Sequence, residues 1–168
     1  LRFSLVMLTA TGQDVFLSND KFEIGRNFMT KIWNAARFLQ MQPLPAGSSS
    51  LTKPSWRASD LRWDDQYILA ILSRTVQEVT EHLERSRFND AAKTVYDFIW
   101  HHFCDWHIES LKIALKNDDS ATRDDSIRVA HYVFAQALQL LHPIAPFITE
   151  ELWQAMGYGD GVSSILHT

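Results

Sequence analysis

Five side chains that could bind a metal or act as an acid, a base or a nucleophile lie close together: His101, His102, Cys104, Asp105 and His107. On a helix, His101 and Asp105 would share one side, and Cys104 and His107 would share another. The two pairs point in different directions, so four ligands do not converge on one ion. The sequence predicts no metal site, with His102 packed, His101 facing solvent and a buried thiol. A metal-binding bundle around His101 and Cys104 stays open as the alternative, which a zinc-dependent rise in melting temperature would support.

Other catalytic patterns are also missing from the sequence. Cys104 falls in the middle of an expected helix and lacks the exposed turn that presents a nucleophile. The chain has no glycine-rich phosphate loop, no serine elbow and no His-Glu zinc helix. The adjacent pairs Asp64-Asp65 and Asp124-Asp125 are interpreted as solvated charges at helix starts. The segment is therefore predicted to be non-catalytic, with no catalytic residue, no metal and no cofactor of its own.

Charge separates one segment from the rest of the chain. Residues 21–37 carry four basic side chains and one acidic one, a balance of 4 − 1 = +3, whereas residues 60–90 carry four basic and seven acidic, or −3. Since the whole chain has a net charge of −4, it is not a general polyanion binder, and any RNA binding must come from a local patch. The basic residues of this segment are Lys21, Arg26, Lys31 and Arg37.

An aromatic ring, two amides and a cation share one side of this basic segment. Asn27, Lys31, Asn34 and Phe38 fall within about 60° of one another at helical periodicity. Unpaired bases need such a set: a ring to stack on, and polar side chains for base edges and phosphates. The structural alternative is that Phe38 turns inward at the helix end and the polar residues are merely solvated.

Composition sets the class of molecule that must position these residues. Of the 168 residues 46% are hydrophobic and 21% charged, which suits one folded core and excludes a disordered chain. A single cysteine excludes a disulfide framework and favours a reducing compartment, so the cytoplasm is the expected location. No apolar run is long enough to span a membrane; Leu5–Leu8 near the start has four residues and Tyr67–Leu72 has six. The opening residues are interpreted as a helix cut from a longer one, in an excised domain.

Apolar periodicity predicts an all-α fold, an antiparallel bundle of four to five helices. The helical segments are expected at 1–9, 18–41, 60–87, 89–115, 123–141 and 147–156. Ser18 or Asn19 is expected to cap the second of these and Asn89 the fourth, whose buried stripe includes His102 and Trp106. The segment 123–141 should be the most buried, 42–59 should be a long loop pinned by Trp56, and 162–166 alternates like a short strand.

Four strings then resemble a known family. They are RNF, KIWNAARF, FCDW and LHPIAPFITEELW, at Arg26–Phe28, Lys31–Phe38, Phe103–Trp106 and Leu141–Trp153. In this order they resemble the anticodon-binding helical domain of the valyl-tRNA synthetases, which are class I aminoacyl-tRNA synthetases. Leu1–Phe3 with Gly12–Asp14 resembles the family's segment just after the KMSKS loop.

The resemblance implies a module that binds the anticodon arm of a valine-specific tRNA while other domains of the same polypeptide perform ATP-dependent ligation. ATP and magnesium are implied only for that intact enzyme, since the HIGH and KMSKS signatures are absent here. No membrane association is implied. Residues 1–17 would be the end of a connecting segment after the catalytic domain, 18–156 the anticodon-binding bundle, and 157–168 the start of a C-terminal segment.

The resemblance also assigns roles within the basic segment. Asn34, Arg37 and Phe38 would contact bases by stacking and at base edges, while Arg26 and Lys31 would neutralise backbone phosphates. Lys21 and Asn27 complete the expected anticodon-binding set, although Asp20 stands where relatives tend to place a basic residue.

Two other functions remain open at this point. The bundle could be a helical scaffold that only packs against a catalytic domain, or the equivalent domain of an isoleucyl- or leucyl-tRNA synthetase, because the PFITEELW string alone does not separate these enzymes. The NAARF and FCDW strings favour valine. A further departure is His107, at a position where an aromatic residue is common.

Overall fold

The computed structural model describes residues 1–9, 19–45, 57, 60–116, 119–158 and 164–165, except for the side chains of residues 19–21. Within these ranges every regular element is helical, which confirms the predicted all-α class. The elements are α1 (Arg2–Leu8), α2 (Asn19–Gln40), α3 (Trp63–Glu84), α4 (Phe88–Asp97), the π-helical η2 (Phe98–His107), α5 (Ile108–Ala114), α6 (Ser120–Leu141) and α7 (Pro146–Met156).

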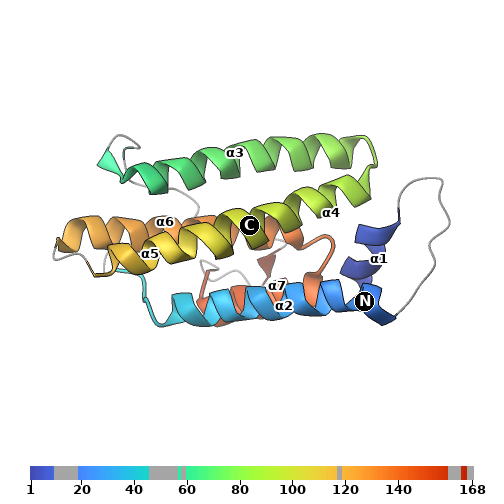
Figure 1. Cartoon of the computed structure of the whole chain (residues 1–168), viewed down its shortest axis with the longest axis horizontal. Helices are drawn as coiled ribbons and strands as arrows, with labels where there is room; N and C mark the ends of the chain where they lie inside the picture. The colour runs from blue at the N-terminus through green and yellow to red at the C-terminus, as the bar shows by residue number, and fades with distance from the viewer. Residues whose placement is uncertain (10–18, 46–56, 58–59, 117–118, 159–163, 166–168) are drawn as a thin grey trace.

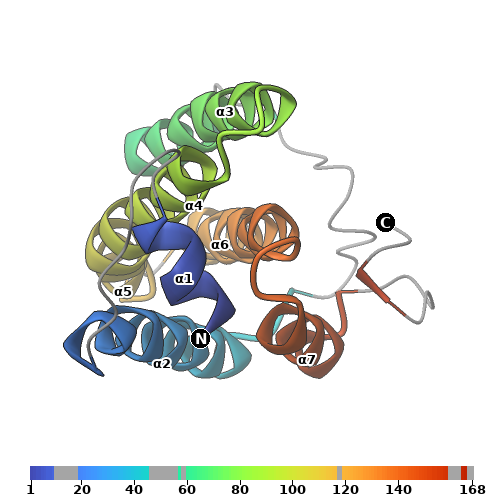
Figure 2. The same cartoon turned by 90° about the vertical axis from the view of Figure 1, so that its right-hand side faces the viewer.

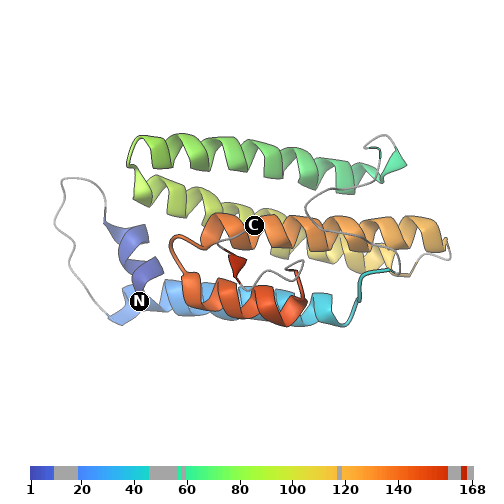
Figure 3. The same ribbon diagram turned by 180° about the vertical axis from the view of Figure 1, so that it is seen from behind.

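One continuous helical rod, formed by α4, η2 and α5, lies between α3 and α2 (Figure 1). The rod runs antiparallel to α3 and to α6, and α6 occupies the middle of the bundle when it is viewed from the end (Figure 2). Seen from behind, α7 lies beside α2 (Figure 3), where Gln40 Nε2 donates to the Ala155 carbonyl at 3.3 Å. The rod therefore has two long flanks, one against α2 and one against α3.

The core is built around α6, as the sequence predicts. Eleven residues of α6 are buried, among them Phe134, whose ring stacks on Phe103 of η2 at a centroid distance of 5.6 Å. The largest fully buried side chain is Trp153 of α7. α6 thus connects the rod to α7 through apolar contacts.

Several predicted boundaries agree closely with the structure. The second helix ends at Gln40, and α7 begins with Pro146 in its first turn, where a missing amide hydrogen costs nothing. Gly157 ends α7 in the left-handed conformation at φ 65°, which glycine adopts without the steric cost of a Cβ.

The expected cap at Asn89 is wrong. The helix begins one residue earlier, at Phe88, and the Asn89 side chain instead donates to the carbonyls of Val6, at 3.1 Å, and Met7. These carbonyls belong to the last turn of α1, and Asn89 supplies donors to them from α4, while the Thr9 hydroxyl also donates to the Val6 carbonyl at 3.4 Å. A residue predicted to act locally therefore fastens α1 to the bundle.

The buried stripe of the rod also differs from the prediction. Phe103 and His107 are fully buried in η2, whereas His102 and Trp106 are only half-buried. The reason is the π-helical geometry, since its hydrogen bonds span five residues and rotate the inward face relative to an α-helix.

Some expectations concern residues outside the described ranges. These are the Ser18 cap, the turn at 11–17, the pinning role of Trp56 and the alternating stretch from residue 162 onward, of which only residues 164 and 165 are described. No helix in the described part of the chain has both the length and the apolar character that crossing a bilayer requires.

Candidate nucleic-acid interface

The predicted stripe on α2 faces the seam between α2 and the rod. Lys31 lies there with its Nζ 4.0 Å from the centre of the Trp100 ring, and it forms an ion pair with Asp105 of η2. Asp105 also lies 3.5 Å from His101 Nδ1. The Lys31 ammonium is therefore already partnered, so an incoming phosphate would compete with the Asp105 carboxylate.

A hollow of about 400 Å³ lies at the C-terminal end of α2. Arg37 is exposed, and it takes no part in the ion pairs recorded among the described residues. Phe38 is half-buried, with its inner side packed against the core. The ring therefore neither turns fully inward nor stands free in solvent. The lining residues are Asn34, Arg37, Phe38, Gln40 and Met41.

A cation from a second helix approaches the Phe38 ring. Lys112 of α5 places its Nζ 5.7 Å from the centre of the Phe38 ring and also pairs with Glu109 at 2.6 Å. Ammonium groups at this distance are attracted to the face of an aromatic ring. Sequence reasoning missed Lys112, because no local pattern shows that α5 passes beside the end of α2.

The other predicted residues lie farther back along α2. Arg26 is exposed and pairs with Glu23 at 3.0 Å, and Asn27 is exposed. The Lys21 side chain lies outside the described residues. The structure thus brings Asn34, Arg37 and Phe38 together, whereas Arg26 and Asn27 precede them by two to three helical turns.

The surface around the C-terminal end of α2 offers an aromatic ring, amide groups and cations. These groups suit the binding of a ligand. An aromatic face accepts any base by stacking, and amides and guanidinium groups bind base edges or phosphates.

The His-Cys cluster on the rod divides among three environments. His101 is exposed, and Cys104 is buried, with its pKa raised to about 12 chiefly by desolvation. His107 points to the opposite flank, toward Asp65. No set of three His, Cys, Asp or Glu side chains in the described ranges is arranged to hold a metal ion. A thiol with so high a pKa is not a nucleophile at neutral pH.

Asp64 and Asp65 do not match the prediction of solvated helix-start charges, because both are buried at 2% exposure. Asp64 accepts hydrogen bonds from Arg62, at 2.6 Å, and from Ser110. Asp65 accepts one from Ser126 at 2.6 Å. Tertiary packing of α3 against α5 and α6 removes these carboxylates from water and supplies the donors that replace it. Asp124 and Asp125 are half-buried, and Arg128 pairs with Asp125.

His107 and Asp65 have pKa values shifted in opposite directions. Burial raises the pKa of Asp65 to about 6, against the Ser126 hydrogen bond, which lowers it. Burial lowers the pKa of His107 to about 4. The two groups are 3.9 Å apart, and neither His107 ring nitrogen has a hydrogen-bond partner among the described residues. Both side chains are therefore neutral in the folded protein at mildly acidic pH.

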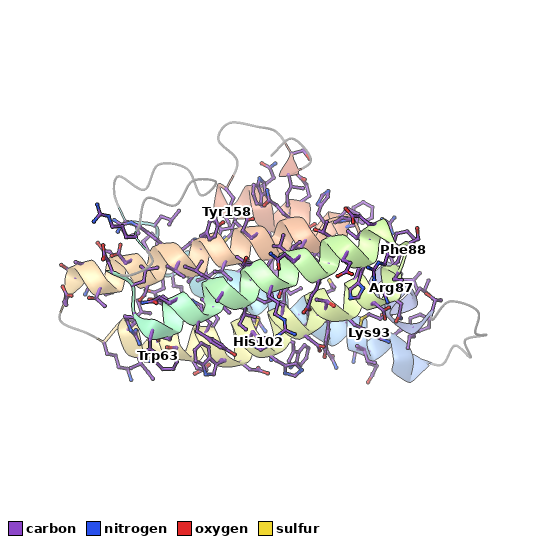
Figure 4. The ribbon with its side chains drawn as sticks, turned by 90° about the horizontal axis from the view of Figure 1, so that it is seen from above. Trp63, Arg87, Phe88, Lys93, His102 and Tyr158 are labelled. Atoms are coloured by element: carbon purple, nitrogen blue, oxygen red, sulfur yellow. The ribbon has the colours of Figure 1, made fainter. Side chains whose placement is uncertain are left out.

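The outer surface of the α3 flank carries the opposite charge from the α2 seam. A second hollow of about 350 Å³ lies between α3 and the rod, with Glu78 and Asp97 in its lining. Its cation, Arg74, is bound to Glu78 at 2.7 Å. Figure 4, which looks down on α3, shows Trp63, His102 and Lys93 along this long side and Tyr158 on the opposite side.

A ring, an amide and a guanidinium group gathered at one end of an all-α bundle are typical of a binding module. Comparison with known proteins specifies it: residues 65–168 match the family model described as the anticodon-binding domain of tRNA ligase. The chain belongs to this family.

Its relatives include valine–tRNA ligases from diverse bacteria. The chain is 41% identical over 92% of its length to the enzyme of Rhizobium meliloti, 38% over 98% to that of Bradyrhizobium diazoefficiens, and 42% over 93% to that of Latilactobacillus sakei. It spans only 16–17% of the length of these relatives.

Proposed function

We propose that this chain binds the anticodon arm of valine tRNA as the recognition part of a larger valine–tRNA ligase. The observation that carries the proposal is the hollow at the end of α2, where Phe38 is flanked by Asn34 and Arg37 and faced by Lys112. The identity of about 40% to valine–tRNA ligases over nearly the whole chain supports the choice of amino acid.

In this proposal an unpaired anticodon base stacks on the outer side of the Phe38 ring. Asn34 and Arg37 bind its edge or the adjoining phosphate. Lys112 leaves the ring as the base enters and pairs with phosphate instead. Arg26, Lys31 and Lys21 attract the flanking backbone, although Lys31 must first loosen its pair with Asp105.

The chemistry of the intact ligase is assigned to other parts of the polypeptide. ATP-dependent ligation, and the ATP and magnesium that it uses, would belong to the catalytic portion in the cytoplasm. This chain's contribution is binding energy at a remote site, which helps place the tRNA acceptor end for reaction.

The test is direct titration of the protein with labelled anticodon stem-loops at low salt. The valine loop is compared with one changed at its middle base, for the natural protein and for Phe38→Ala. We expect the natural protein to prefer the valine loop and Phe38→Ala to lose about 1–3 kcal/mol of affinity, the usual contribution of one stacked base. Phe88→Ala is the matched control, since Phe88 is an exposed ring at the start of α4, 56% accessible.

Two results would count against the proposal. If Phe38→Ala lowered the melting temperature but left RNA affinity unchanged, the helical-scaffold function would be favoured. A preference for isoleucine or leucine loops would move the chain to another ligase of the same family.

A further inference from the structure

The second hollow, between α3 and the rod, is long and narrow. The α3 residues of its lining run from Tyr67 to Glu78, which is about three turns of helix or about 16 Å. Because the rod runs antiparallel to α3, His102 lies toward the Tyr67 end and Thr94 toward the Glu78 end. A hollow of this shape suits an extended ligand that follows the seam between the helices.

Several polar side chains of this hollow have no hydrogen-bond partner in the described part of the protein. Thr75 is only 5% exposed and lines the hollow, and its hydroxyl forms no hydrogen bond with any other described residue. The same is true of the Thr94 hydroxyl and the His102 ring, which also line it. A buried hydroxyl without a partner costs free energy. A ligand that donates hydrogen bonds would therefore satisfy groups that the fold leaves unpaired.

The two ends of the hollow attract positive charge in different ways. At one end Asp97 is exposed and belongs to none of the ion pairs among the described residues, and Glu78 pairs with Arg74, a side chain that is 74% exposed. At the other end the Tyr67 ring lies edge-on to Trp106 at a centroid distance of 4.9 Å. Carboxylates and aromatic faces both bind ammonium groups. Each end can therefore bind one cationic group.

The middle of the hollow is apolar. Ile71 of α3 and Phe98 of η2 line it between the two ends, and they suit methylene groups better than a hydrated ion. The carboxylates and His102 do not converge on a single ion, since no set of three His, Cys, Asp or Glu side chains among the described residues is arranged to hold a metal. The lining thus matches a chain of methylene groups with a positive charge at each end.

We propose that the second hollow binds a linear polyamine, with one ammonium group between Asp97 and Glu78 and another on the Tyr67 ring. The methylene groups pack against the apolar middle, and a nitrogen within the chain donates to the Thr75 hydroxyl. The ligand competes with the exposed Arg74 side chain for Glu78. Because the hollow lies on the α3 flank of the rod, this site is separate from the RNA surface on α2.

Calorimetric titration of the protein with two trivalent cations, in the absence of RNA, tests the proposal. Spermidine is linear, whereas hexaamminecobalt(III) carries the same charge in a compact ion that cannot reach both ends of the hollow. We expect spermidine to bind at least about tenfold more tightly, since general attraction to a negatively charged protein depends on the charge alone. Equal affinities would show only such general attraction and would overturn the proposal.

Substitution of Asp97 tests the position of the site. Asp97→Asn should weaken spermidine binding by about fivefold, because it removes the unpaired carboxylate from the hollow. Asp90→Asn is the matched control, since it removes the same charge from the surface of α4 outside the hollow, and it should weaken binding by less than about twofold. Equal weakening by the two variants would contradict a site in the hollow.

Substitution of Thr75 tests the buried hydroxyl. Thr75→Val should weaken spermidine binding by about two- to fivefold without lowering the melting temperature, because the hydroxyl forms no hydrogen bond that folding would lose. If spermidine affinity stayed the same in both Asp97→Asn and Thr75→Val, the polyamine would bind elsewhere and the inference would be wrong. Because no step uses RNA, that failure would leave the proposed anticodon function untouched.

Discussion

The rod formed by α4, η2 and α5 presents polar side chains to both α2 and α3. On the α2 flank these side chains lie at the surface, and on the α3 flank they are buried. On the α2 flank, Asp105 and Lys112 meet their partners at the surface, where water and a ligand can reach them. On the α3 flank, His107 and Ser110 meet Asp65 and Asp64 in the interior. Polar groups on the first flank are open to exchange with a ligand and suit binding, whereas those on the second are buried, with Asp64 and Asp65 hydrogen-bonded inside the protein, and serve the fold.

The largest effect should come from breaking the interior flank. Asp64→Ala removes the acceptor for Arg62 and Ser110, so we expect a loss of about 2–3 kcal/mol in the free energy of unfolding, measured by urea titration. The RNA affinity of the folded protein should not change. Asp90→Ala, at a surface pair whose atoms are 3.9 Å apart, is the control and should cost less than about 1 kcal/mol. Equal losses in the two variants would contradict the distinction between the flanks.

The second prediction concerns the pH dependence of the interior pair. Asp65 has a raised pKa of about 6, so its contribution to stability is full below its unfolded pKa and is lost as pH rises through 6. His107 has a lowered pKa of about 4, so its contribution is present above its unfolded pKa of 6.5 and is lost as pH falls toward 4. The two contributions therefore nearly cancel in the natural protein.

Single substitutions should reveal the two opposite slopes. Between pH 7 and pH 4, Asp65→Asn should lose roughly 2–3 kcal/mol relative to the natural protein, and His107→Phe should gain roughly 2–3 kcal/mol relative to it. Unfolding titrations at several pH values provide the measurement. Parallel pH profiles for all three proteins would show that the pair is not coupled to folding in this way.

A smaller effect, on RNA affinity, is expected from a substitution on the α2 flank. Asp105→Asn releases Lys31 from its ion pair, so affinity for the anticodon stem-loop should rise by about two- to fivefold, in line with the modest energy of exposed pairs. Asp97→Asn is the matched control, since it removes the same charge from the second hollow, between α3 and the rod. It should change RNA affinity less than Asp105→Asn does. If both variants gained equally, the effect would be net charge rather than release of Lys31.

The smallest effect is a change in salt dependence. Lys112→Ala should reduce the slope of log affinity against log salt by about 0.7 to 0.9, the value of one phosphate contact. Lys93→Ala, on the α3 flank, should leave the slope unchanged. Equal slopes for the natural protein and Lys112→Ala would mean that Lys112 stays on the Phe38 ring when RNA binds.

The two flanks also differ in how far sequence could predict them. The helix limits followed from local periodicity, and α2 was placed with its stripe of Asn27, Lys31, Asn34 and Phe38 intact. The burial of Asp64 and Asp65 could not be predicted, because carboxylates at a helix start look the same whether another helix covers them or not.

The same limit applies to contacts across helices. Asn89 is a residue type that commonly caps helices, but its hydrogen-bond partner lies in α1. Lys112 matters only because α5 passes beside Phe38. Both roles depend on a neighbouring helix that is distant in the sequence.

The π-helical segment η2 determines how the side chains after it are rotated about the rod axis relative to those before it. Before η2, Tyr96 faces α1 and α2 through the rings of Phe3 and Phe28, while after it Ser110 faces Asp64 and Lys112 faces Phe38. Deleting a single residue from η2 would turn everything downstream by about 100° relative to everything upstream. Lys112 would leave the ring and Ser110 would leave its carboxylate in the same event. Insertions and deletions in η2 should therefore be far less tolerated than substitutions, because the segment sets the register for both flanks at once.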